Sequence, residues 1–165
     1  MPVDVGLRVR TLFSPDDDVQ AAFLEFIQAT EHHLRIAIYG LHLPPLIQDL
    51  VLLHQRGADV ALVIDHTEAH GTAEHPEVQA LRTAGVPLLE GTSDRARIMH
   101  HKFAVRDRES VWSGSYNFSI SAQLESNFAD QVDNADRAAL FLAQWQKIWD
   151  WMQAHDARWN AGAGT

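Results

Sequence analysis

Two short runs of apolar residues constrain the fold of this chain more than any other feature of its sequence. Residues 34–39 and 61–65 are apolar at almost every position, without the alternation typical of a strand with one solvated face. Strands of this kind occur in sheets that are covered on both faces. The segments around them repeat apolar residues at helical spacing. The sequence therefore predicts an α/β fold, a mixed β-sheet flanked by helices on both faces.

Strands and helices are expected to alternate along most of the chain. Pro44 and Pro45 are typical of a helix start, and Gly57 and Gly85 of helix ends. The 165 residues fit a single domain, with a frayed tail expected from about residue 157. We expect strands at 9–13, 34–39, 61–65, 86–90, 101–106, 110–113 and 128–132, and helices at 17–29, 44–55, 76–84 and 135–155.

The segment of residues 99–119 contains the candidate catalytic residues. It places His100, Lys102 and Asp107 in the spacing H-x-K-x4-D and follows them with Ser115 and Asn117. Because side chains alternate along a strand, His100 and Lys102 would share one face, roughly 6–7 Å apart at about 3.3 Å per residue. Asp107 falls in a turn between two strands. We therefore expect it to support the motif, by fixing the hairpin or by orienting a neighbour, rather than to contact phosphate.

These residue types suit the cleavage of a phosphodiester. A neutral imidazole attacks phosphorus and a protonated one donates to the leaving oxygen, so one histidine does not serve both steps at once. Lys102 would place a compact positive charge on the non-bridging oxygens, and Ser115 and Asn117 would add neutral donors. The chain contains two lysines, and one of them is Lys102. The pattern predicts phosphodiester chemistry centred on His100.

The motif resembles that of the phospholipase D superfamily, in particular its small single-motif bacterial endonucleases. The resemblance extends to residues 13–16, 34–40 and 56–65 and to the C-terminal helix with Trp145 and Trp149. It implies a phosphohistidine intermediate, no metal and no cofactor. In this superfamily a complete site needs two copies of the motif. A single copy therefore implies a homodimer that builds one site from two subunits.

One part of the sequence departs from the family pattern. Many members carry a glutamate about ten residues beyond the motif asparagine, where it holds the catalytic imidazole. Here the region of residues 125–130 has no glutamate at that position. Glu125, Asn127 or Asp130 are the candidates to replace it, and the replacement bears on activity more than on fold.

Charge is distributed unevenly along the chain. The net charge is −9, yet residues 91–108 contain five Lys and Arg against two Asp. This pattern predicts a local basic strip on an acidic body, which suits an enzyme that binds phosphate only at its site. Arg95 and Arg97 are the expected substrate contacts, with His66 and Asn127 as weaker candidates.

A group of histidines follows the second apolar run. His66, Glu68, His70 and His75 are ligand-type residues, but they lie in a polar segment without an evident helical i, i+4 register. We therefore predict no metal site. A loop at this edge of the sheet would instead border the active site, where His66 would touch substrate.

The leading functional hypothesis is a metal-independent endonuclease that acts on DNA or RNA as a homodimer. The first alternative is a phospholipase or a phosphodiesterase of small diesters, and the second is a non-catalytic dimer that binds nucleic acid or a partner. The first 18 residues lack the pattern of a signal peptide, and no apolar run is long enough to span a membrane. The expectation is therefore a cytoplasmic protein without a membrane partner; the motif does not distinguish DNA from RNA.

Overall fold

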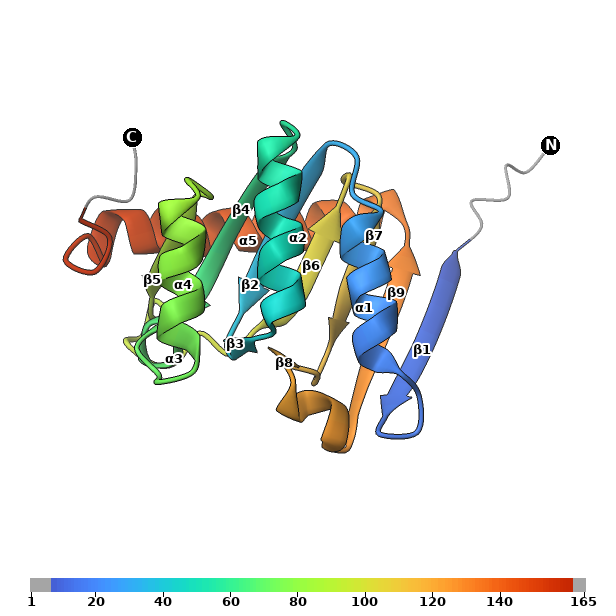
Figure 1. Cartoon of the computed structure of the whole chain (residues 1–165). Helices are drawn as coiled ribbons and strands as arrows, with labels where there is room; N and C mark the ends of the chain where they lie inside the picture. The colour runs from blue at the N-terminus through green and yellow to red at the C-terminus, as the bar shows by residue number, and fades with distance from the viewer. Residues whose placement is uncertain (1–6, 162–165) are drawn as a thin grey trace.

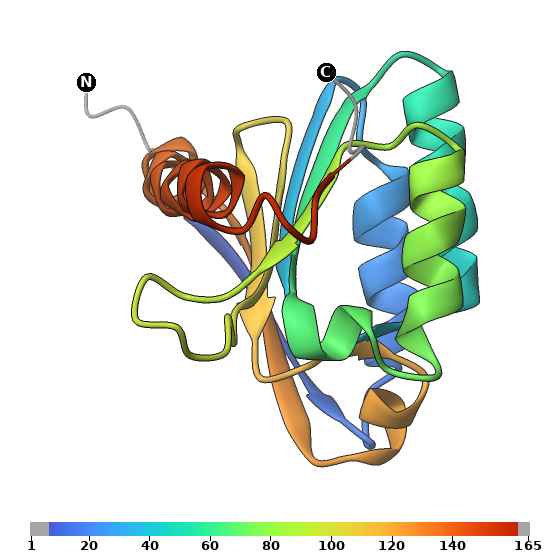
Figure 2. The same cartoon turned by 90° about the vertical axis from the view of Figure 1, so that its left-hand side faces the viewer.

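A seven-stranded mixed sheet separates two helical layers in the computed structural model, which describes residues 7–161 (Figures 1 and 2). The strand order is β1-β9-β7-β6-β2-β4-β5. Strands β2, β4 and β5 run parallel, whereas β6, β7, β9 and β1 pair antiparallel with their neighbours. The seven strands are β1 (Arg8–Ser14), β2 (His33–Ile38), β4 (Asp59–Asp65), β5 (Leu88–Gly91), β6 (Lys102–Arg106), β7 (Ser110–Gly114) and β9 (Asn127–Asp133).

The helices lie on both faces of the sheet, so the predicted fold class is confirmed. Figure 2 shows α1, α2 and α4 on one face and the long α5 across the other. The helical elements are α1 (Val19–Gln28), α2 (Pro44–Gln55), α3 (His66–Ala69), α4 (Glu74–Thr83), the 3₁₀ turn η1 (Ser121–Leu124) and α5 (Ala135–His155). A two-stranded sheet of β3 (Leu41–His42) and β8 (Phe118–Ser119), which the sequence did not predict, lies at one edge.

The central strands are buried on both faces, as their apolar composition requires. In β4, Leu62 and Ile64 pack toward α1, α2 and α4, whereas Ala61 and Val63 pack toward α5. On α5, Trp145 is buried and its indole Nε1 donates to the carbonyl of Ile36, at 2.8 Å. Since α5 is held across the sheet in this way, it forms one wall at the edge where the motif lies.

Part of the tail contacts the sheet. Residues 157–160 turn back onto it, and the side chain of Asn160 bonds both backbone groups of Glu90, at 2.9 and 2.8 Å. Fraying from about residue 157 stays a prediction, and these paired amide contacts are the interactions that oppose it as far as residue 160. Residues 1–6 and 162–165 lie outside the described part of the chain, together with the expectations made for them.

The sheet topology collects several candidate residues at one edge. Strand β6 is antiparallel to β2, so its first residue, Lys102, lies opposite Ile38 at the carboxyl end of β2. The carboxyl ends of β4 and β5 lie at the same edge, since both are parallel to β2. This edge also holds α3 and the small β3–β8 sheet, at the bottom of Figure 1.

Candidate active site

His100 lies in the loop that precedes β6, and its side chain is exposed. The backbone around it is fixed at three points. The amide of Met99 donates to Oδ2 of Asp65 at 2.8 Å, and the carbonyl of His101 accepts from the amide of Tyr39 at 2.9 Å. The carbonyl of His100 itself accepts from Nζ of Lys102 at 3.1 Å. The imidazole is thus presented to solvent from a rigid backbone.

Lys102 begins β6 and is only 9% exposed. As predicted, it shares a sheet face with Ala104, while Phe103 and Val105 pack on the opposite face toward α5. Burial lowers the pKa of the Lys102 ammonium, and the charge of Glu68 partly opposes this by favouring the charged form. A phosphate oxygen bound here would offset a desolvation that the protein alone leaves largely uncompensated.

Tyr39 and Gly40, which the sequence analysis did not single out, connect the motif residues. The Tyr39 ring lies edge-on to the imidazole of His100 with centroids 4.7 Å apart, and Nζ of Lys102 lies 5.2 Å from the same ring centroid. Asn117 accepts from the Gly40 amide through Oδ1 at 3.2 Å. A Cβ at position 40 would lie 3.2 Å from the Asn117 side chain, so the close approach favours glycine. His100, Lys102 and Asn117 therefore gather around the end of β2.

Ser115 and Asn127 form a second polar pair beside the motif. Ser115 Oγ donates to Oδ1 of Asn127 at 3.0 Å and accepts from the Phe128 amide at 3.1 Å. The Asn127 amide group also reaches Glu125 Oε2 at 3.4 Å. Asn127 thus contacts the motif serine directly, and it is the candidate for the missing glutamate that the structure places nearest to the motif.

Glu125 and Asp130 have other contacts. Asp130 lies within β9 and accepts from the hydroxyl of Thr11 on β1 at 2.5 Å. Glu125 is exposed after η1 and meets Asn127. Within residues 7–161 no hydrogen bond joins either carboxylate to His100, so the structure gives no support to the expectation that one of them orients the imidazole.

Asp107 lies far from the edge of the sheet that holds His100 and Lys102. It lies at the opposite end of β6 from His100 and accepts from the backbone amides of Glu31, His32 and His33 at 3.0, 2.8 and 2.9 Å. These contacts are compatible with the supporting role expected for Asp107, which stays a prediction, and they place it away from the other candidate catalytic residues. It ties the β6–β7 turn to the start of β2, rather than fixing the hairpin alone.

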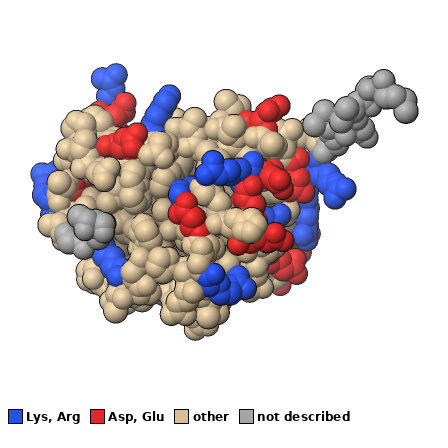
Figure 3. All heavy atoms as spheres, turned by 90° about the horizontal axis from the view of Figure 1, so that it is seen from above, with Lys and Arg blue, Asp and Glu red and all other residues tan. Residues whose placement is uncertain are grey.

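The basic residues around the motif do not form one strip. Arg95 and Arg97 are exposed in the loop before β6, near His100. Arg106 instead donates to the Phe26 carbonyl and to Ser110 Oγ, at 3.2 and 3.3 Å, and Arg108 lies in the β6–β7 turn. The predicted local basic strip is therefore wrong for Arg106 and Arg108, because β6 carries them to the other end of the sheet. At the end of the sheet opposite the motif, acidic and basic side chains are interspersed (Figure 3).

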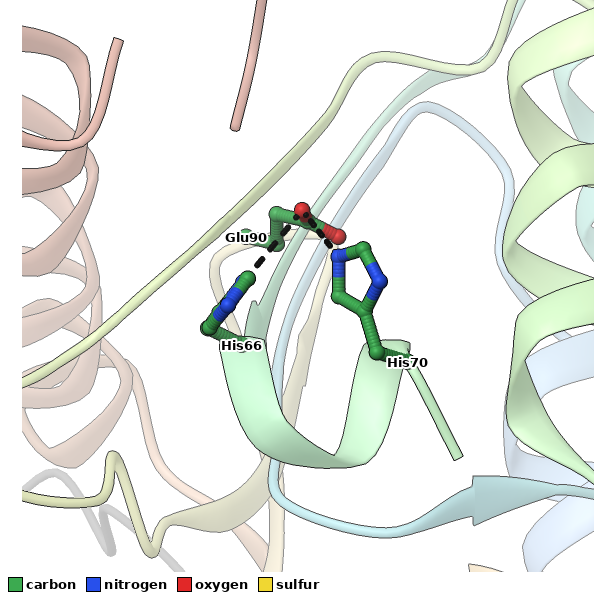
Figure 4. A group of neighbouring side chains, drawn as sticks. All are labelled: His66, His70 and Glu90. Atoms are coloured by element: carbon green, nitrogen blue, oxygen red, sulfur yellow. Dashed lines mark hydrogen bonds and ion pairs between the residues drawn. The ribbon is translucent and has the colours of Figure 1, made fainter. Parts of the chain in front are cut away.

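His66 lies beside two other ligand-type side chains at the edge of the sheet that holds the motif. It begins α3, a single helical turn capped by Asp65, whose Oδ1 accepts from the Thr67 amide at 2.9 Å. This cap creates the i, i+4 register between His66 and His70 that the sequence analysis did not recognise. Both imidazoles point toward Glu90 on β5, as Figure 4 shows. Glu68 lies between the two histidines in the sequence of α3; burial first, and then the neighbouring Glu68 carboxylate, raise the pKa of Tyr39.

A cavity of about 350 Å³ adjoins His100, between the loop before β6 and α5. Its lining is both polar and apolar, and it includes Lys147, the second lysine of the chain, which the sequence analysis left unassigned. The other lining residues are Thr92, Ser93, Asp94, Ile98, Met99, His101, Gln144, Ile148 and Trp151.

Comparison with known proteins identifies the family. The family model described as "Cardiolipin synthase, PLD-like domain" matches residues 23–149. The chain belongs to this phospholipase D-like family. Its superfamily includes phosphodiester hydrolases. Among the described helices, none has the length and apolar character needed to cross a membrane.

Curated relatives match most of this chain but only part of their own length. Mitochondrial cardiolipin hydrolase of Xenopus tropicalis is 27% identical over 135 residues, 81% of this chain and 62% of that protein. The human protein of the same name is 28% identical over 77% of this chain and 49% of its own length. A phospholipase D of Rickettsia prowazekii is 24% identical over 83% of this chain and 65% of its own. The chain thus spans about half to two thirds of these relatives.

Two solved structures are similar to this chain over nearly their whole length. Nuc of Salmonella typhimurium, a phospholipase D family member, has a TM-score of 0.81 and 28% identity, covering 87% of this chain and 95% of Nuc. NucT of Helicobacter pylori has a TM-score of 0.79 at 18% identity, over 87% of this chain and 96% of NucT, which shows a shared fold. The seven-stranded sheet with helices on both faces is therefore the phospholipase D fold.

Asp107→Asn is expected to reduce stability far more than turnover. Burial raises the pKa of Asp107, but its three backbone hydrogen bonds outweigh this and lower it below the usual range. Losing the charged acceptor should cost about 2 kcal/mol, which lowers Tm by about 4–8 °C. Asparagine tolerates the left-handed backbone at this position, where φ is 51°.

The pH dependence of this effect follows from the direction of the shift. A carboxylate with a lowered folded pKa contributes stability above its unfolded pKa and loses it as pH falls through the folded value. The difference in Tm between wild type and Asp107→Asn should be full at neutral pH and shrink below about pH 4. Thermal unfolding and initial rates measured together check this. A large loss of turnover with unchanged Tm would assign Asp107 to the reaction instead.

Proposed function

We propose that this protein is a metal-independent nuclease that cleaves phosphodiester bonds of DNA or RNA at a site shared by two copies of the chain. The observation that carries the proposal is the placement of one exposed, rigidly held His100 beside a buried Lys102. The motif occurs once in the sequence, so one chain supplies a single nucleophile. A two-fold dimer brings each residue near its axis against its own copy.

The reaction requires both histidines in sequence. An imidazole nitrogen of one His100 attacks phosphorus, a P–N bond forms, and the P–O bond to the leaving group breaks. The protonated His100 of the second copy gives its proton to the leaving alkoxide. That second imidazole then takes a proton from water, whose oxygen attacks phosphorus and breaks the P–N bond. Product leaves with the new oxygen, and both histidines return to their starting forms.

The remaining motif residues stabilise negative charge during these steps. Lys102 lies against Tyr39 with little solvent around it, so its charge acts on the phosphoryl oxygens at low dielectric. The Asn117 amide group keeps its donors for substrate, since only its oxygen is used by Gly40. Ser115 is held in place by Asn127, and we expect it to act as a neutral donor at the rim of the active site.

The surroundings of His100 favour a polyanion as substrate. Arg95 and Arg97 are exposed in the loop that carries His100. Lys147 lines the adjoining cavity from α5, on the far wall. Lys147 in the cavity and the two exposed arginines of the adjacent loop suit a phosphate backbone that continues beyond the scissile bond, whereas Asp94 adds one negative charge to the lining. The small bacterial endonucleases that the sequence resembles act on substrates of this kind.

A phospholipid diester is the second candidate substrate. The names of the curated relatives, cardiolipin hydrolase and phospholipase D, favour it, as does the family description. In the cavity, Ile98, Ile148 and Trp151 offer apolar surface next to His100. Both substrates would be cleaved by the same two-histidine chemistry. They differ only in the part of the substrate that binds beside the scissile phosphate.

A substrate panel with chelator present separates these functions. We expect single-stranded DNA or RNA to be cleaved, with the rate unchanged within about twofold by EDTA, because Lys102 and neutral donors replace a cation. Increasing salt should weaken substrate binding steeply. The panel contains single-stranded DNA, single-stranded RNA, plasmid and cardiolipin vesicles, with His100→Ala as the control for contaminating activity.

Each outcome of this panel identifies one of the alternatives. Hydrolysis of cardiolipin alone would replace the nuclease proposal with the lipid one. Loss of activity in EDTA, with recovery on adding a divalent cation, would contradict metal-independent catalysis. Binding of nucleic acid without hydrolysis of any substrate would indicate the non-catalytic dimer.

A further inference from the structure

Three ligand-type side chains converge at the carboxyl end of β5, outside the site described above. They are His66, His70 and Glu90, and their ligand atoms all lie within 4.8 Å of one another. Nδ1 of His66 is 3.5 Å and Nε2 of His70 is 2.9 Å from the same carboxylate oxygen, Oε1 of Glu90. Figure 4 shows the two imidazoles at the two ends of α3, both directed at that carboxylate.

Hydrogen bonds within the protein leave this group incompletely satisfied. Nδ1 of His66 is buried and has no hydrogen-bond partner among the described residues, and the same holds for Nη2 of Arg82, 3.6 Å from Glu90 Oε2. If His66 is neutral and its Nδ1 carries the lone pair, that lone pair faces the lone pairs of the Glu90 carboxylate, and the two groups repel each other. Protonation of both imidazoles would instead place two cations beside Arg82 around one buried carboxylate. A cation between the three ligand atoms would satisfy both lone pairs and the charge of Glu90.

The ligand side chains are held in place by contacts that do not involve their ligand atoms. The His66 ring stacks on Trp159, with centroids 3.6 Å apart and an interplanar angle of 15°. Asn160 bonds both backbone groups of Glu90, whose side chain is only 2% exposed. The Asp65 cap sets the single turn that spaces His66 and His70. Preorganisation of this kind lowers the cost of ordering ligands when an ion binds.

We propose that His66 Nδ1, His70 Nε2 and Glu90 Oε1 bind a divalent cation of the zinc class. Two imidazoles and one carboxylate are a ligand set that zinc uses, with water in the fourth position of a tetrahedron. In such a site the ligand atoms lie about 3.4 Å apart, because each is about 2.1 Å from the metal. The observed distances between the three ligand atoms would have to change by about an ångström to reach that geometry. Arg82 stays on the other oxygen of Glu90 and balances its remaining charge.

The cation has a structural role at this site. Strands β2 and β4 separate β5 from β6, so Glu90 and Lys102 are about 14 Å apart at about 4.8 Å per strand. The ion therefore does not reach a phosphate at His100. It ties α3 to β5 through His66, His70 and Glu90. Metal binding is thus expected to stabilise this part of the fold without taking part in the reaction, so that its removal with EDTA lowers Tm and leaves the rate within the twofold range expected above.

Titration of tag-free protein with zinc tests this proposal. The protein is first stripped with EDTA and dialysed, and binding is then measured by calorimetry together with thermal unfolding. We expect one equivalent with a Kd in the micromolar range or below, and a Tm increase of about 5–10 °C at a hundredfold excess over Kd. His70→Gln, at a half-exposed position, should weaken binding at least about tenfold.

The matched control is His75→Gln, on the neighbouring α4. Its ring centroid lies 5.8 Å from that of His70, and it is outside the group of three ligands. It should bind zinc as wild type does, within about twofold. Cobalt bound in the wild type should show the intense visible absorption of a tetrahedral site, and His70→Gln should lose it. Absence of saturable binding, or equal binding by wild type and His70→Gln, overturns the proposal.

Discussion

Replacement of Lys102 by methionine is expected to lower kcat by about 10²–10³-fold while leaving the fold as stable as before or more stable. The two side chains have similar length and volume, so packing against Tyr39 and Ala104 is retained. Lys102 is 9% exposed and burial lowers the pKa of its ammonium, so we expect the folded protein to gain little from this charge in the absence of substrate. The prediction is therefore that the charge serves the reaction rather than stability.

The measurement combines kinetics with thermal unfolding. Arg108→Met is the matched control, since it removes one positive charge from the exposed turn at the other end of β6. It should leave kcat within about twofold of wild type. A Lys102→Met enzyme with near-native turnover would remove charge stabilisation by this residue from the mechanism. A fall in Tm of the same variant would instead assign the ammonium a structural role.

The sequence predicts the fold well where one physical pattern dominates. The bounds of α5 are those expected, because Asn134 accepts from the Arg137 amide at its start and the apolar stripe continues to Met152. Burial of β2 and β4 on both faces follows from their nearly continuous apolar residues. The alternation along β6 places Phe103 and Lys102 on opposite faces, as predicted.

The candidate site is predicted only where its residues are close in sequence. His100, Lys102 and Asn117 belong to one segment, so the motif identifies them together. Tyr39 lies 61 positions before His100, at the end of another strand, and it joins the site only because β2 pairs with β6. No local pattern marks such a residue. The one signal in the sequence that points to Tyr39 is its position before Gly40, at the end of a buried strand.

Two placements that the sequence did not reveal, those of the β6–β7 turn and of Glu90, have the same physical origin. Asp107 and Arg108 are near the motif in sequence, but a strand of five residues carries them to the opposite end of the sheet. Glu90 is distant in sequence from His66, yet the parallel pairing of β4 and β5 brings it beside α3. Nearness along the chain therefore misleads whenever a strand intervenes, and pairing of strands decides which polar groups meet.

His100→Ala is expected to abolish hydrolysis, by about 10⁴-fold or more, with an unchanged Tm. The side chain is exposed and its backbone is held by bonds that alanine keeps, since they involve Asp65, Tyr39 and the His100 carbonyl. Loss of the nucleophile removes the P–N intermediate, and no other described histidine ring lies against Tyr39 to replace it. An alanine variant with residual activity near that of wild type would exclude His100 as the nucleophile.

A mixed dimer makes the test of His100 sharper. Two differently tagged copies, one wild type and one His100→Ala, are coexpressed and purified through both tags, and a doubly tagged wild-type dimer is the control. If the two imidazoles share one phosphorus, the mixed dimer contains a nucleophile without its acid, or an acid without its nucleophile. It should therefore retain no more than about 1% of the control activity. Half the control activity would show that each subunit works alone, and a monomer in sedimentation analysis of the wild type would contradict the shared site directly.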